Sequence, residues 1–153
     1  MFRRLSRAGA LLAAAILVVA CSSGPTPAPT APATLPGTSW SLGIQGGSAP
    51  AAQQPPTLVF GTDGSVSGFT GCDPYTGTFT VNGSSLTFAG LARTPSNNQC
   101  APQVVTAADA FITALGGVTG WSTQVLAPTT GVRVLQPVRL LLNGPTAMVF
   151  TLQ

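Results

Sequence analysis

Residues 79–88 read Phe-Thr-Val-Asn-Gly-Ser-Ser-Leu-Thr-Phe, and this stretch decides the fold class. Apolar side chains alternate with polar ones on both sides of Asn82-Gly83. Such alternation indicates a strand with one buried face. Asn-Gly tolerates positive φ angles and is typical of the tight turn in a β-hairpin. The stretch therefore predicts two antiparallel strands.

The same pattern recurs on both sides of this hairpin. Asp63-Gly64 and Asn143-Gly144-Pro145 are further turn signals between apolar runs. The 45–56 segment, rich in Gly, Ala, Gln and Pro, has no apolar period and predicts a loop. Further strands are expected at 40–44, 57–60, 66–69, 125–126, 138–142 and 147–152.

One segment predicts a helix, because its apolar residues recur at helical spacing: Val104, Ala108, Phe111, Ile112 and Leu115. Thr106 and Asp109 have the spacing of a capping box, and Gly116-Gly117 is a stop signal. The predicted class is α+β, mostly β. It is an antiparallel, strongly curved sheet of about seven or eight strands with one short helix packed on it.

The first 20 residues predict a signal peptide. Arg3, Arg4 and Arg7 precede the uncharged run 8–20, which is too short to span a membrane. The run ends in Ala20-Cys21, which resembles the lipobox of bacterial lipoproteins. The resemblance implies cleavage before Cys21 and lipid on its sulfur. The alternative is an ordinary secretory signal with Cys21 incidental.

The segment 21–36 is expected to be a tether. Five of the fifteen residues from 22 to 36 are Pro, and such a composition cannot bury enough surface to fold. Proline favours extended chain, so this segment could span up to roughly 45 Å. The folded domain is then expected at 37–153, with 117 residues for one core.

Charge argues against several functions. The net charge of +3 comes from the leader, because the chain after residue 20 carries three Arg and three Asp. We therefore expect no nucleic-acid partner. The chain has no His and no Glu, so acid–base and zinc chemistry have few candidate side chains. We expect no catalytic residues, no metal ligands and no cofactor.

Two cysteines remain beside Cys21. An exported chain meets an oxidising compartment, so Cys72 and Cys100 are expected to form a structural disulfide. The alternatives are a reactive free thiol or a redox pair, although the usual C-x-x-C spacing of redox pairs is absent.

The folded region resembles the META domain, also called HslJ-like. Its most specific segment is 68–77, GFTGCDPYTG, which is similar to the family signature G-x-x-G-C-N-x-Y-x-G. Segment 37–42 looks like the opening G-T-x-W-x-L, and 57–64 like the family's L-x-F-x-x-D-G hairpin. Departures are Asp73 in place of Asn and a longer segment before Cys100. The resemblance implies a mixed β domain in the envelope, without an established activity.

Several side chains leave two interpretations open. Asp73 and Tyr75 could bind a cation or a polar ligand, or they could fix a turn and pack in the core, which we favour. Trp40 and Trp121 are expected in the core rather than in ligand stacking. An enzyme would have to use Asp63, Asp73 or Tyr75.

We therefore expect a non-catalytic, lipid-anchored, monomeric envelope domain that binds a partner or supports stress tolerance. The alternative is a small-molecule carrier with a cavity between sheet and helix. Its partners would be the membrane, through lipid on Cys21, and an envelope protein or small ligand. It would lie on the outer membrane facing the periplasm if the cell has two membranes. Otherwise it would lie on the outer face of the plasma membrane.

Overall fold

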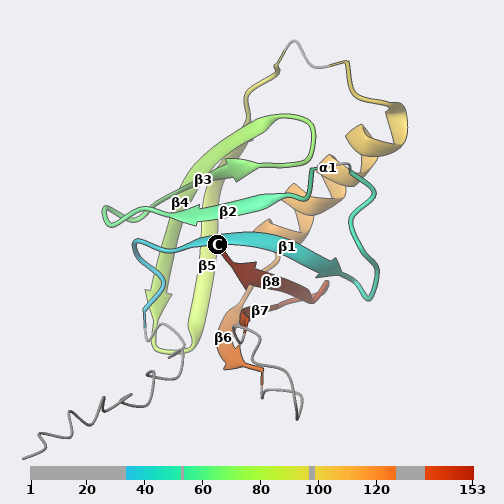
Figure 1. The fold of residues 1–153 in the computed structure, drawn as a ribbon. Helices are drawn as coiled ribbons and strands as arrows, with labels where there is room; N and C mark the ends of the chain where they lie inside the picture. The colour runs from blue at the N-terminus through green and yellow to red at the C-terminus, as the bar shows by residue number, and fades with distance from the viewer. Residues whose placement is uncertain (1–33, 53, 97–98, 127–136) are drawn as a thin grey trace, which may run out of the picture.

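A computed structural model describes residues 34–52, 54–96, 99–126 and 137–153 (Figure 1). The predicted signal peptide 1–20, the lipidation residue Cys21 and the tether up to residue 33 lie outside the described residues. Leu35, which lies in the segment expected to be a tether, is fully buried in the core, so the packed domain begins before the expected boundary at 37. Its aliphatic side chain is the reason, since it adds apolar surface to the core.

The described residues form a closed antiparallel barrel in which the strands follow chain order. Strand β8 pairs with both β7 and β1, which closes the ring. The predicted fold class is confirmed, and the sheet is curved enough to close. The strands are β1 (Ser39–Gln45), β2 (Thr57–Phe60), β3 (Ser65–Phe69), β4 (Pro74–Asn82), β5 (Ser85–Arg93), β6 (Gly120–Val125), β7 (Val138–Asn143) and β8 (Met148–Leu152).

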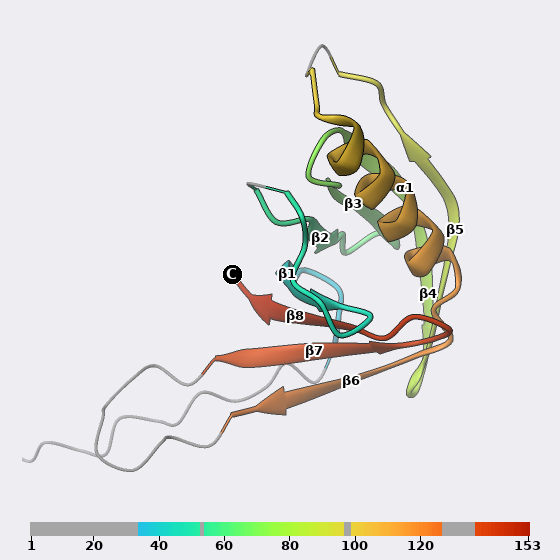
Figure 2. The same ribbon diagram turned by 90° about the vertical axis from the view of Figure 1, so that its right-hand side faces the viewer.

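The strand pairing of the barrel is shortest between β5 and β6. Their paired register contains one position, Ser85 with Gly120, whereas β4 and β5 pair from Asn82–Ser85 to Tyr75–Arg93. The helix α1 (Pro102–Gly116) connects these two strands and runs beside β5 (Figure 2). A helix at this place covers the part of β5 that β6 leaves unpaired, which protects an open sheet edge.

Alternate side chains of the strands fill the interior together with one face of α1. Phe111 of the helix is fully buried, and its ring lies 5.8 Å from that of Tyr75 and 6.3 Å from that of Phe150, centre to centre. Leu115, one helical turn later, is also fully buried. The space between helix and sheet is therefore occupied by packed side chains at these positions.

The predicted capping box of the helix is wrong, although the helix and its stop at Gly116-Gly117 are confirmed. The N-cap residue is Ala101, which has no side-chain cap, and Pro102 opens the helix. Proline suits a first helical position because its ring presets φ and its missing N–H has no partner there anyway. Thr106 lies inside the helix, where its hydroxyl donates to the Pro102 carbonyl oxygen at 3.0 Å.

Candidate functional site

The signature segment 68–77 comprises the end of β3, the connecting residues 70–73 (the signature loop) and the beginning of β4. Its glycines allow close backbone contacts. A Cβ on Gly68 would collide with the carbonyl group of Thr57 and would lie 2.9 Å from the Tyr75 ring. Gly71 has a φ of +96°, and a Cβ there would lie 2.7 Å from the Ala52 side chain. Larger residues would push apart β2, β3 and the β1–β2 loop.

Tyr75 of this segment is a core residue. Its side chain is 1% exposed, and its hydroxyl donates a hydrogen bond to the Thr57 carbonyl oxygen at 2.8 Å. The Thr57 hydroxyl in turn accepts from the backbone N–H of Phe69 at 3.0 Å. Burial raises the pKa of the Tyr75 phenol well above its ordinary value. These contacts fasten β4 to β2 across β3.

Asp73 binds the segment that follows β5. Its carboxylate accepts hydrogen bonds from the backbone N–H of Ser96 at 2.9 Å and from the Ser96 hydroxyl at 2.7 Å. These bonds, with a smaller contribution from the charge of Arg93, hold the pKa of the Asp73 carboxyl below its ordinary value. Asp73 therefore has a structural role, but its partner is the distant Ser96 and not, as the structural interpretation expected, the neighbouring backbone of its own turn.

Arg93 lies between two acids. Its Nη2 is 2.8 Å from Asp109 of α1, and its Nη1 is 3.7 Å from the Asp73 carboxylate. The Asp109 side chain is 61% exposed, so this pair contributes little stability on its own. Its effect is geometric, because it links β5, the signature loop and the helix.

Cys72 and Cys100 form a disulfide with a Cα–Cα distance of 5.9 Å. Cys100 directly precedes the N-cap residue of α1. The bond therefore fastens the beginning of the helix to the signature loop. This pairing agrees with the sequence-based expectation of a structural bridge.

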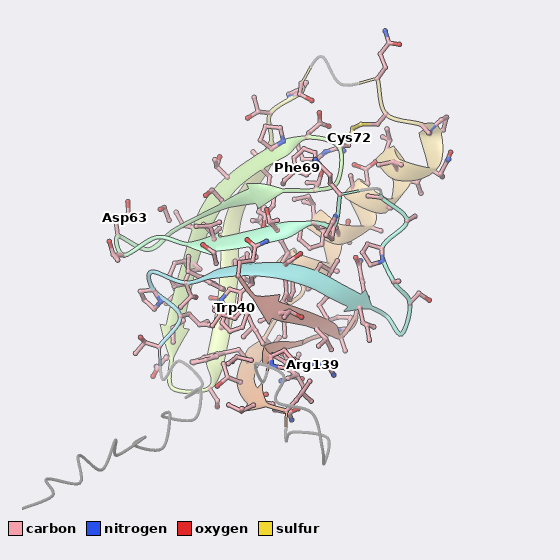
Figure 3. The ribbon with its side chains drawn as sticks, viewed as in Figure 1. Trp40, Asp63, Phe69, Cys72 and Arg139 are labelled. Carbon is pink, nitrogen blue, oxygen red and sulfur yellow. A yellow bond between two sulfur atoms is a disulfide. The ribbon has the colours of Figure 1, made fainter. Side chains whose placement is uncertain are left out.

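The three side chains named for a possible enzyme do not converge. Asp63 lies at the tip of the β2–β3 hairpin, at the opposite end of β3 from Cys72 (Figure 3). Its carboxylate accepts hydrogen bonds from the backbone N–H and the hydroxyl of Ser65, which lower its pKa. Among the described residues, no three His, Cys, Asp or Glu side chains gather as a metal site would require.

Trp40 lies in the core as expected, whereas Trp121 is only partly buried at the edge of the core. Trp40 is fully buried, and its indole N–H donates to the Thr38 hydroxyl at 2.7 Å. Trp121 is partly buried against the core, and its indole N–H donates to the Gly83 carbonyl oxygen at 3.0 Å. This second bond joins β6 to the turn between β4 and β5.

The structure adds a groove that sequence reasoning missed. It has a volume of about 740 Å³ and lies between α1, the β1–β2 loop and the β7–β8 turn. The predicted cavity was placed between sheet and helix, whereas this groove lies on another side of the helix. The feature of the sequence that could have indicated this groove is a set of small residues at helical spacing within the helix. The groove is lined by Gln45, Ser48, Ala49, Pro50, Ala51, Ala107, Ala110, Thr113, Ala114, Gly117, Pro145 and Thr146.

Comparisons with known structures support the fold. An NMR structure of a protein from Burkholderia xenovorans is 24% identical, with a TM-score of 0.57 over 85% of this chain and 97% of that one. A second NMR structure is 22% identical, with a TM-score of 0.54 over 77% of this chain and 91% of that one. At these identities the likeness concerns the fold alone. No curated protein matches the chain.

None of the described helices has the length and apolar character needed to cross a bilayer. A family model for the META domain matches residues 33–143, which include the signature segment, α1 and strands β1 to β7. Strand β8 lies beyond the match yet completes the barrel through its pairs with β1 and β7. The match covers more than half of the chain, and the chain belongs to the META domain family.

Proposed function

We propose that this protein is a non-catalytic, lipid-anchored domain of the cell envelope, which binds a partner there or supports envelope stress tolerance. The observation that carries the proposal is how the polar side chains of the signature segment are bonded. Asp73 and Tyr75 are both engaged in internal hydrogen bonds that hold loops and strands together. Side chains engaged in this way support a scaffold rather than a reaction centre.

Anchoring is the part of the proposal with a direct test. The lipobox-like Ala20-Cys21 and the Pro-rich segment after it support a domain held near the membrane by lipid on Cys21. In a cell with two membranes the domain would face the periplasm from the outer membrane. In a cell with one membrane it would lie on the outer face of the plasma membrane.

The test is metabolic labelling of the full chain with radioactive palmitate in a bacterial host. We expect label on the wild-type chain, which fractionates with membranes, and none on the Cys21→Ala variant. A Cys100→Ala variant is the matched control and is expected to keep the label. An unlabelled wild-type chain, or equal label on Cys21→Ala, would contradict the anchoring proposal.

A second candidate function is a small-molecule carrier. The groove beside α1 favours it, since its volume of about 740 Å³ falls within the roughly 300–1,000 Å³ of typical ligand sites. In this interpretation the groove, rather than the packed space between helix and sheet, would hold the ligand.

A further inference from the structure

Two hollows adjoin beside α1. The larger one is the groove described above, and a second hollow of about 530 Å³ lies at the beginning of α1, beside the disulfide. Ala51 of the β1–β2 loop lines both hollows. The two hollows therefore have two walls in common, the helix on one side and the β1–β2 loop on the other.

Both walls are fastened to the signature loop. The β1–β2 loop packs at Ala52 against Gly71, where no side chain larger than hydrogen fits. The helix is joined to the same loop by the Cys72–Cys100 disulfide and to β5 by the ion pair of Arg93 with Asp109. These contacts restrain both walls, and a restrained groove loses less conformational entropy when a ligand enters it, which favours binding.

The groove carries no charge. Every side chain that lines either hollow is uncharged. Asp109 is the single charged residue within α1, and it is paired with Arg93 of β5. An ionised ligand group placed in the groove would lose water without gaining a counter-charge, which is costly. The lining thus favours a neutral ligand.

The larger hollow also lacks aromatic rings, and Gln45 is the one long side chain among its lining residues. Its helix wall presents Ala107, Ala110 and Thr113, and its other walls present Ala, Ser, Pro, Thr and Gln45. A wall of this kind has no ring on which a flat ligand could stack. Its short methyl-bearing side chains instead offer van der Waals contact to a slender chain.

We propose that the larger hollow binds the uncharged aliphatic chain of a small neutral amphiphile. This inference rests on the carrier function proposed above and names the class of ligand. The chain would lie along α1 between Ala110 and the β1–β2 loop, and burial of its methylene groups would provide the affinity.

The test compares two probes of equal chain length, 1-octanol and sodium octanoate. The ¹⁵N-labelled chain from residue 22 to 153, which contains every described residue, is titrated with each probe and followed by amide chemical shifts. We expect saturable shifts for 1-octanol at Ala49, Ala51, Ala107 and Ala110. We expect octanoate to bind the same residues at least tenfold more weakly.

Two threonines of α1 provide a matched pair of variants. Thr113 lines the groove and Thr106 does not, while both are exposed and both donate to the carbonyl four residues earlier. Thr113→Phe should lower the affinity for 1-octanol at least tenfold, and Thr106→Phe should leave it within twofold. Dispersed amide spectra of both variants would show that each is folded.

Each possible failure has a separate meaning. Octanoate binding as tightly as 1-octanol at these residues would overturn the neutral ligand class and leave the carrier function standing. Failure of both probes to shift groove residues in the folded protein would overturn the carrier function as well as the ligand class. Undiminished binding by Thr113→Phe would overturn the assigned location. The palmitate experiment tests membrane anchoring independently of all three results.

Discussion

At the scale of single residues, the signature segment acts as a structural fastening. Gly68 permits contact with Thr57, and Tyr75 donates to the same Thr57 carbonyl. Asp73 binds Ser96, which is 23 residues later in the chain. This one short segment thus connects β2, β4 and the chain after β5.

Gly68→Ala should lower the free energy of unfolding, by about 1–3 kcal/mol, because the added methyl would overlap the Thr57 carbonyl and the backbone would have to shift. Gly116→Ala is the control, since a Cβ at this helical position meets no atom within 4 Å. That change should leave the stability equal or raise it by up to about 1 kcal/mol. Urea unfolding measures both. Equal stability of the two variants would show that Gly68 is not a close-contact position.

At the scale of elements, α1 depends on contacts with its surroundings. It begins at Ala101 without a side-chain cap and has no acidic residue in its first turn. An isolated helix of this length is marginal in water, so its stability comes from packing. Its attachments are the buried face that includes Phe111, the ion pair through Asp109 and the disulfide just before its first turn.

Replacing both cysteines by alanine, Cys72→Ala with Cys100→Ala, should destabilise the domain. The disulfide closes a loop of 29 residues, for which chain entropy gives roughly 3–4 kcal/mol. The measurement is urea unfolding of the double variant against the oxidised parent. The reduced parent should resemble the double variant, and equal midpoints for the oxidised and reduced parent would contradict a stabilising role.

At the scale of the whole molecule, closure of the barrel depends on pairing between its first and last strands. Strand β8 joins β7 to β1, while the single paired position between β5 and β6 leaves an opening that α1 covers. Tyr75 contacts the helix residue Phe111 within this enclosure. It is also the one tyrosine of the chain, which makes it a reporter of global unfolding.

The tyrosine absorbance at 295 nm should not titrate near pH 10 in the folded protein, because burial raises the pKa of Tyr75. A raised folded pKa stabilises the protein fully below the unfolded value of about 10, and this contribution declines as the pH rises above it. Tyrosinate absorbance should therefore appear together with loss of far-ultraviolet circular dichroism. The protein in urea, which should titrate near pH 10, is the control. Ionisation near pH 10 with the fold intact would contradict burial of this side chain.

The sequence by itself determined the elements whose signals are local. Alternation around Asn82-Gly83 predicted the β4–β5 hairpin, and helical spacing predicted α1, because such periods reflect which face of an element is buried. The cysteine pairing was also readable, since with Cys21 set aside as the expected lipidation residue, Cys72 and Cys100 allow one bridge within the chain. The capping box failed because Pro102, four residues before Thr106, already opens the helix.

Only the tertiary structure decided what the signature residues do and where the groove lies. Tyr75 meets Thr57 across 18 residues of sequence, and the groove joins residues from the β1–β2 loop, α1 and the β7–β8 turn. Such contacts depend on how strands and helix pack in three dimensions, and no local period encodes them. The shape of the groove depends on how the backbones of these three segments approach one another. The sequence shows only that these segments contain small, uncharged residues.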